Sequence, residues 1–240
     1  MGESIDRVRV LWPDHLGLAR GKYVPASLAD KGTHHCTGTW SLGYDRVMTP
    51  GTIGSYWDEG LPDFDATYDM SELRPSWEPL TRVVVADVER NGVPFSVSPR
   101  TALHKAIADW RVLGYEPYVG MEFEAYVFTP DDQGGWKPME TPGAYVYGTG
   151  PSVDPHGLID AIWAACSKAE IPLESVNSEY DSPQFEFTLC YTNALRSADD
   201  GFLFKVLARE AEGRHQPVVV FLFGLRNGEE QATPLRLKPV

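Results

Sequence analysis

Cysteine is scarce in this chain, which limits the metal and redox chemistry that the sequence can support. The 240 residues include three cysteines, Cys36, Cys166 and Cys190, and no two of them form a CxxC pair. This count and these wide spacings argue against a zinc ribbon and against a thioredoxin-like motif. We expect all three thiols to be reduced and structural, with Cys166 in the core because it lies in an apolar run.

Basic residues are also few, and long apolar runs are absent. Lys and Arg total 21 against 34 Asp and Glu, which gives a formal net charge of −13. A chain this acidic, with its cations scattered singly, should repel nucleic acids and anionic membranes. No run of about 18 apolar residues exists, and the start MGESIDRVRV does not resemble a signal peptide. These features predict a cytoplasmic protein without a membrane span.

The sequence lacks internal repeats, low-complexity tracts and a strict alternation of strands with helices. This pattern favours an α+β fold over a doubly wound parallel sheet. Residues 31–79, rich in Gly, Pro, Asp and aromatics, predict long loops with short strands. Elsewhere, periodicity and helix start signals predict strands at 5–12, 20–24, 81–88, 116–129, 173–180 and 184–190, and helices at 99–113, 155–169 and 195–210.

Two carboxylates stand on one face of the predicted strand 116–129. Side chains alternate along a strand, so Glu122 and Glu124 share a face. The opposite face is apolar and carries Val119, Met121, Phe123 and Ala125. Like charges this close repel each other, and a hard divalent cation such as Mg²⁺ would remove that repulsion. Taken alone, such a pair is more often a solvated strand face than a metal site.

A second acidic strand makes the metal interpretation stronger. Gln184, Glu186 and Thr188 share one face of strand 184–190, and the alternate positions are apolar. Glu179 precedes Glu186 by seven residues, and the intervening Asp181–Pro183 segment can bend the chain. Glu174 lies five residues before Glu179. Two strands that each carry acids on one face and apolar residues on the other predict an acid-lined pocket built on a sheet.

Five segments of the chain resemble, in the same order, segments of the glutamine synthetase family. They are Asp14–Pro25 (DHLGLARGKYVP), Ser98–Leu103 (SPRTAL), Gly120–Tyr126 (GMEFEAY), Glu179–Glu186 (EYDSPQFE), and the later helix with Ala198–Asp199 and Phe204–Lys205. The acidic segments match the family's Gly-x-Glu-x-Glu strand and its Glu…Gln-x-Glu segment. The resemblance spans roughly residues 5–210 and identifies the chain as a member of this family.

The resemblance implies a β-grasp-like domain at 1–92 and part of an antiparallel-sheet catalytic domain at 93–240. It implies an ATP-dependent ligase that joins ammonia or another amine to the γ-carboxylate of glutamate through a γ-glutamyl phosphate. By matched position, Glu124, Glu179 and Glu186 would hold one Mg²⁺ or Mn²⁺, and Glu122 would help to hold a second. Glu174 matches an acid on the nucleotide side, and no catalytic residue is assigned. An intact family member would be a homo-oligomer, with loops from 31–79 reaching a neighbouring subunit.

The chain also departs from the family pattern. Asn177-Ser178 stand where many glutamine synthetases have His-His, and the family branch that uses larger amines such as polyamines also lacks those histidines. Pro183 stands where a glycine is usual. Residues 212–240 look atypical, which suggests a truncated or frameshifted chain with little or no turnover by itself. An inactive remnant or a regulatory metal- or nucleotide-binding homologue that co-assembles with a full-length relative is the alternative. An unrelated acidic α+β binding protein is a third interpretation.

Overall fold

The computed structural model describes residues 4–211 together with the backbone of residues 218–221 and 235–239. The chain divides into two compact units, Met1–Leu113 and Gly114–Val240. The division follows the first α-helix, α1 (Pro99–Val112), so this helix belongs to the first unit. The family-based assignment of residues 1–92 and 93–240 to two domains remains a prediction.

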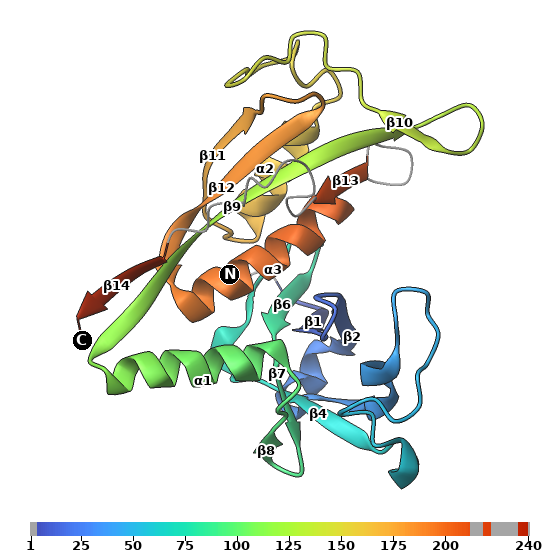
Figure 1. Ribbon diagram of the computed structural model, residues 1–240, viewed down its shortest axis with the longest axis vertical. Coiled ribbons are helices and arrows are strands. Elements are labelled where there is room, and N and C mark those ends of the chain that lie inside the picture. The colour runs from blue at the N-terminus through green and yellow to red at the C-terminus, as the bar shows by residue number, and fades with distance from the viewer. Residues whose placement is uncertain (1–3, 212–217, 222–234, 240) are drawn as a thin grey trace. The chain divides into compact units, whose positions relative to one another are not determined.

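The first unit contains two four-stranded sheets (Figure 1). One sheet has the order β2-β1-β6-β5, with strands Ala19–Pro25, Arg7–Pro13, Thr81–Val85 and Arg74–Pro75. The other has the order β3-β4-β7-β8, with strands Thr33–Cys36, Asp63–Thr67, Asp87–Arg90 and Val93–Pro94. Strand β1 pairs with β6 in parallel, whereas the other pairings in both sheets are antiparallel. Short 3-10 helices lie at Ala26–Lys31, Thr37–Ser41, Trp57–Glu59 and Met70–Glu72. A β-grasp arrangement of this unit stays a prediction.

Aromatic side chains fill the core shared by these two sheets. The Trp12 ring centroid lies 5.3 Å from that of Trp40 and 5.0 Å from that of Phe64. Trp12 comes from β1 and Phe64 from β4, so one core joins both sheets. Large buried aromatics remove much apolar area from water, and this burial stabilises the unit.

One imidazole is packed against this aromatic core. The His35 ring stacks on Phe64 with centroids 5.5 Å apart, and its Nε2 lies 2.8 Å from the Thr33 hydroxyl. Burial, with help from the positive charge of Lys22, lowers the pKa of His35 from 6.5 to about 4. The neutral imidazole is therefore the form that this packing accepts.

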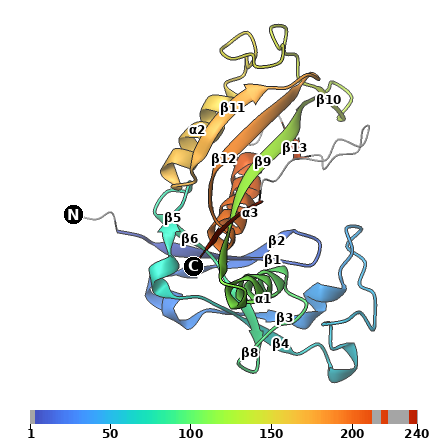
Figure 2. The same ribbon diagram turned by 60° about the vertical axis from the view of Figure 1, so that its left-hand side comes forward.

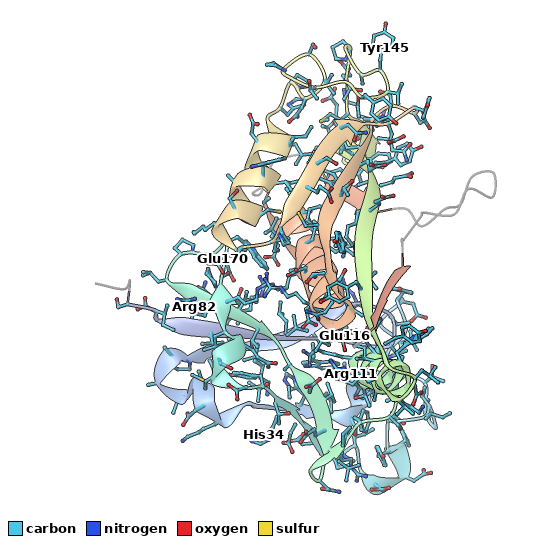
Figure 3. All side chains as sticks on the ribbon, turned by 90° about the vertical axis from the view of Figure 1, so that its left-hand side faces the viewer. His34, Arg82, Arg111, Glu116, Tyr145 and Glu170 are labelled. Atoms are coloured by element: carbon cyan, nitrogen blue, oxygen red, sulfur yellow. The ribbon has the colours of Figure 1, made fainter. Side chains whose placement is uncertain are left out.

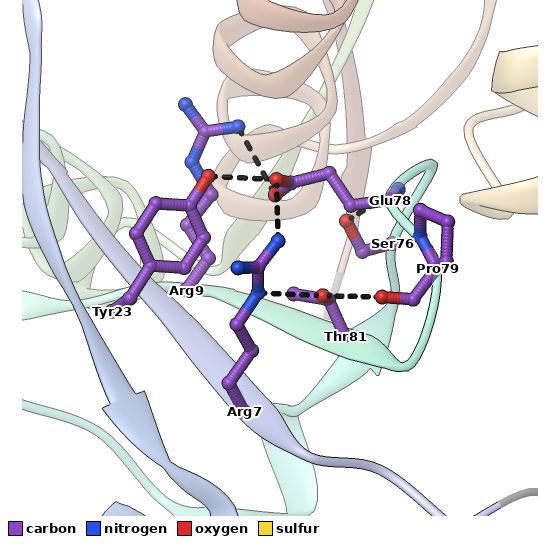
Figure 4. A network of polar contacts seen from close by, with 7 residues as sticks. All are labelled: Arg7, Arg9, Tyr23, Ser76, Glu78, Pro79 and Thr81. Carbon is purple, nitrogen blue, oxygen red and sulfur yellow. Dashed lines mark hydrogen bonds and ion pairs between the residues drawn. The ribbon is translucent and has the colours of Figure 1, made fainter.

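A single carboxylate joins the turn between β5 and β6 to the neighbouring hairpin (Figure 4). Glu78 accepts hydrogen bonds from Arg7 at 3.1 Å, from Arg9 at 3.4 Å and from the Tyr23 hydroxyl at 2.7 Å. The Arg7 guanidinium also lies 4.5 Å from the centroid of the Tyr23 ring. Three donors on one carboxylate satisfy its charge, so Glu78 is a structural acid.

Helix α1 begins and ends where the sequence predicts. Ser98 is the N-cap residue and Pro99 occupies the first turn, where its missing N–H costs no hydrogen bond. Gly114 follows the C-cap with φ +82°, a left-handed conformation that glycine adopts without a steric penalty. The predicted helix 99–113 is thus confirmed to within one residue.

The second unit is organised around one long strand, β9 (Tyr115–Pro130), as Figures 1 and 2 show. The sheet order is β10-β9-β12-β11, with β10 at Trp136–Pro138, β12 at Gln184–Asn193 and β11 at Leu173–Ser178. Two further strands, β13 (Val218–Phe221) and β14 (Leu235–Pro239), also pair with β9. Every pairing in this sheet is antiparallel, which confirms the predicted antiparallel sheet.

Helices α2 (Leu158–Lys168) and α3 (Ala194–Glu210) cover one face of this sheet (Figure 2). Helix α2 begins later than the predicted residue 155. The Asp154 carboxylate accepts a hydrogen bond from the amide of Ile159 at 2.7 Å, and Gly157 is left-handed at φ +70°. The Asp-Pro pair therefore forms a turn before the helix instead of its first turn, which corrects the expected start.

The state of the cysteines and the character of the helices can be stated for the described part of the chain. Cys36, Cys166 and Cys190 are all free thiols, and Cys166 is buried as expected. None of the described helices has both the length and the apolar composition that a membrane crossing needs.

Candidate metal centre

The two predicted acidic strands are neighbours in the sheet of the second unit. In the antiparallel register of β9 and β12, Glu186 lies directly opposite Glu124, and Thr188 lies opposite Glu122. Directly opposed residues of antiparallel strands point to the same face of a sheet. The register therefore places three of the four predicted metal-binding carboxylates on one face, which we call the acidic face: Glu122, Glu124 and Glu186.

Aromatic packing on the other face fixes this orientation. Phe123 and Phe187 each lie with ring centroids 5.3 Å from Phe204 of helix α3. The absence of a side chain at Gly201 permits this approach, because a Cβ there would lie 3.0 Å from the Phe123 ring. A register shift of one residue would expose these rings and bury the glutamates, so the packing selects the acidic face.

Glu179 reaches the same face through the turn that joins β11 to β12. Its amide donates to the carbonyl of Gln184 at 2.9 Å, which continues the ladder one step beyond the end of β11. Asn177, two residues earlier on β11, lies opposite Glu186 and donates from its side-chain amide to Glu179 Oε1 at 3.2 Å. By this alternation, Glu179 and Asn177 join the acidic face.

The electrostatics of the face are those of crowded carboxylates. The pKa of Glu186 is raised by partial burial first, and then by the negative charges of Glu179 and Glu122. The hydroxyl of Thr188, which donates to Glu186 Oε1 at 3.3 Å, acts in the opposite sense on the Glu186 pKa. Gln184 donates to Glu124 Oε2 at 2.5 Å. Neutral donors hold the carboxylates in place without cancelling their charge.

A divalent cation fits the chemistry of this face. Four carboxylates supply the oxygen ligands that Mg²⁺ and Mn²⁺ prefer, and a cation would relieve the repulsion that raises the Glu186 pKa. Among residues 4–211, however, no three Asp, Glu, His or Cys side chains already stand as a metal-binding cluster. The described side chains thus share a face without converging on a single point.

Glu174, the acid predicted for the nucleotide side, has a different setting. It is exposed and lies in β11 at the register shift between Leu173 and Ser175. Its side chain makes no hydrogen bond or ion pair with the residues that the structure describes. The register does not align it with the other acids, and its role stays a prediction.

The sequence reasoning missed two polar partners of the acidic face. In the sequence, Asn177 stands out only as a departure from a family pattern. In the structure, its side-chain amide donates a hydrogen bond to Glu179. Tyr126 donates to Asp181 at 2.7 Å and lies opposite Gln184, which links the end of β9 to the turn after Glu179. Strand alternation alone could have placed Tyr126 two positions from Glu124 on the same face.

The second unit is an antiparallel sheet with helices on one face and four carboxylates on the other, so the protein is an α+β protein with a candidate cation site. The model of the protein family described as "Glutamine synthetase, catalytic domain" matches residues 96–225, more than half of the chain. The protein therefore belongs to the glutamine synthetase family. The match ends at residue 225, later than the expected loss of resemblance at residue 212.

Named relatives and a solved structure agree with this family. The chain is 29% identical over 233 residues to a glutamate–isopropylamine ligase of Pseudomonas sp, covering 91% of this chain and 50% of the relative. It is 28% identical over 235 residues to a gamma-glutamylethanolamide synthetase of Streptomyces coelicolor, with coverage of 91% and 50%. A structure entitled "Apo GmaS without ligand" aligns with a TM-score of 0.76 at 22% identity, covering 98% of this chain and 55% of that one. The chain thus spans about half the length of the curated relatives it matches.

Proposed function

We propose that this chain carries part of the active site of an ATP-dependent glutamate–amine ligase. The reaction would join an amine to the γ-carboxylate of glutamate through a γ-glutamyl phosphate. Family membership and the names of the two curated relatives support the reaction class. The observation that carries the proposal is the cross-strand pair Glu124–Glu186, with Glu179 and Glu122 close enough to raise the Glu186 pKa.

Each acid has a proposed role in this reaction. Glu124, Glu179 and Glu186 would hold one divalent cation, Glu122 would help to hold a second, and Glu174 would face the nucleotide. Mg²⁺ or Mn²⁺ there would offset the repulsion between the ATP phosphates and the glutamate carboxylate and orient the transfer. The chain's own contribution is to keep the acids aligned, through hydrogen bonds such as that from Gln184 to Glu124.

For the second substrate, we propose a primary amine larger than ammonia. The two curated relatives bear names that refer to isopropylamine and to an ethanolamide. The small polar pair Asn177-Ser178 in this chain supports the same branch of the family. Ammonia remains the competing substrate, and its use would place the protein among the glutamine-forming members. Homo-oligomeric assembly and a cytoplasmic location stay predictions that rest on the family.

Product formation provides the direct test of this function. Purified protein would be incubated with ATP, Mg²⁺ and glutamate, and with isopropylamine, ethanolamine, putrescine or ammonium in parallel. Phosphate release and mass detection of the γ-glutamyl amide would be measured together. From this chain alone we expect little or no product; in a full-length protein that carries these residues, we expect an amide of one of the larger amines, and a loss of at least about 10²-fold in rate for Glu186→Gln.

The control variant is Glu140→Gln, which removes the same charge from a side chain of the same unit that is 86% exposed. Its rate should match that of the unchanged protein. Metal and nucleotide binding without any γ-glutamyl product, in the full chain and in a mixture with a full-length relative, would support the non-catalytic alternative instead. An equal loss in both variants would contradict the assigned role of Glu186.

A further inference from the structure

A buried hydroxyl next to Glu179 holds a neighbouring loop to the sheet. Ser178, the last residue of β11, is fully buried. Its Oγ accepts a hydrogen bond from the amide of Gly148 at 3.0 Å and donates to the carbonyl of Tyr145. Its backbone accepts from the amide of Tyr147 at 2.8 Å and donates to the carbonyl of Gly148 at 3.2 Å. Its Oγ also lies 3.4 Å from the carbonyl of Gly148, so one residue makes five polar contacts with the segment 145–148.

This loop has few other means of attachment at this point. Tyr145 and Tyr147 direct their side chains to solvent, with 79% and 74% of their surface exposed, and Figure 3 shows Tyr145 at the outer tip of the loop. Tyr147 also adopts φ +62°, a left-handed conformation that is uncommon for a residue with a side chain. Within the loop, the amide of Gly148 also donates to the carbonyl of Tyr145 at 2.7 Å, and Ser178 adds the contacts that join this backbone to the sheet.

The packing around the hydroxyl leaves no spare room. A Cβ added to Gly148 would lie 2.8 Å from Ser178 Oγ and 2.8 Å from the Tyr145 carbonyl oxygen. A second contact joins the hydroxyls of Thr141 and Ser182, three residues beyond Glu179. The loop is therefore attached on both sides of Glu179, at Ser178 and at Ser182.

We propose that Ser178 is a positioning residue for the metal site, because it attaches segment 145–148 behind the strand end that carries Glu179. Strand alternation directs Ser178 away from the acidic face, so the hydroxyl does not contact the cation. It acts through the backbone of Glu179, which lies beyond the regular strand and needs an external support. This inference rests on the proposed function, since it assigns Glu179 as a metal ligand.

The test compares Mn²⁺ binding to the full chain and to three variants by electron paramagnetic resonance titration, well below the unfolding temperature. Ser178→Ala removes the hydroxyl and keeps the backbone contacts, and we expect about 10-fold weaker binding, the scale found for groups that orient metal ligands. Gly148→Ala pushes the loop away without changing any donor, and binding should weaken similarly. Ser167→Ala, at an exposed serine of helix α2, is the matched control and should bind as the unchanged chain does.

Hydrogen exchange at the amides of Tyr147 and Gly148 supplies the second measurement. Both amides should exchange faster in Ser178→Ala than in Ser167→Ala. Unchanged Mn²⁺ affinity in Ser178→Ala, even with a lower unfolding temperature, would show a merely structural role and overturn this inference alone. If the unchanged chain binds no Mn²⁺ at all, the metal site itself fails, and the positioning role fails with it.

Discussion

The two faces of the sheet formed by β9 and β12 differ in what they contribute to the protein. On one face, Phe187 is fully buried against helix α3 together with Phe123 and Phe185. On the other, Glu124 and Glu186 lie opposite each other, and partial burial together with the negative charges of Glu179 and Glu122 raises the pKa of Glu186. Burial on the apolar face raises the free energy of unfolding, whereas repulsion between the carboxylates of the acidic face lowers it. Such a cost is typical of sites shaped by function.

The largest expected effect comes from the apolar face. Phe187→Ala should lower the free energy of unfolding by about 3–5 kcal/mol, because it removes a fully buried ring and leaves a cavity beside Phe204. Chemical denaturation monitored by circular dichroism would measure the change. Phe187→Leu should cost clearly less. A loss below about 1 kcal/mol for the alanine variant would mean that this face is not the main source of stability.

A pH titration examines the partly buried imidazole of His35 in the other unit. The pKa of His35 is about 4 in the folded protein and 6.5 as the ordinary value. Between these values the unfolded chain binds more protons, so stability should be complete above pH 6.5 and fall as the pH drops towards 4. The partly exposed ring should contribute on the order of 1–2 kcal/mol. The His35→Gln variant should lose this component of the pH dependence, and an unchanged profile would refute the assignment.

The carboxylate of Glu78 has hydrogen-bond donors around it, unlike the crowded carboxylates of the acidic face. Glu78 receives three donors, so Glu78→Gln should lower the free energy of unfolding by about 1 kcal/mol. Thermal denaturation at low and high salt would measure the change, and the difference between the two proteins should shrink as salt screens the ion pairs. A stabilising effect would show that Glu78 is as crowded as the acids of the metal site.

The smallest expected change is a gain in stability, in contrast to the losses expected above. Glu186→Gln, measured without divalent cations, should raise the free energy of unfolding by about 0.2–1 kcal/mol, because like charges directly opposed on two strands are destabilising. Side-by-side denaturation of both proteins in a chelating buffer would detect it. Destabilisation by this variant would indicate that Glu186 has a cationic partner within the chain.

Much of this arrangement could be predicted from the sequence because it depends on local alternation. The pattern around Glu122 and Glu124 specifies which side chains share a face, and the structure confirms that division by burying Phe123 and Ala125. Helix α1 was predicted for the same reason, since Pro99 and Gly114 act at fixed positions relative to a helix. Such signals need no knowledge of distant residues.

Features that depend on contacts between distant segments could not be predicted in this way. The opposition of Glu124 and Glu186 is a matter of register between strands 60 residues apart, and only the packed sheet defines it. Asp154 looked like the start of a helix, but its carboxylate caps the amide of Ile159 across a turn. The five contacts of Ser178 join a strand to a loop about 30 residues earlier, for which no local pattern exists.

Binding of a divalent cation to the acidic face through Glu186 can be measured by a thermal shift titration with Mn²⁺. At a concentration of 100 times Kd, a bound ion should stabilise the unchanged chain by about 2.7 kcal/mol and raise its unfolding temperature. Glu140→Gln should respond equally, whereas Glu186→Gln should show little or no rise. An equal rise in Glu186→Gln, or no rise in the unchanged chain, would contradict the account.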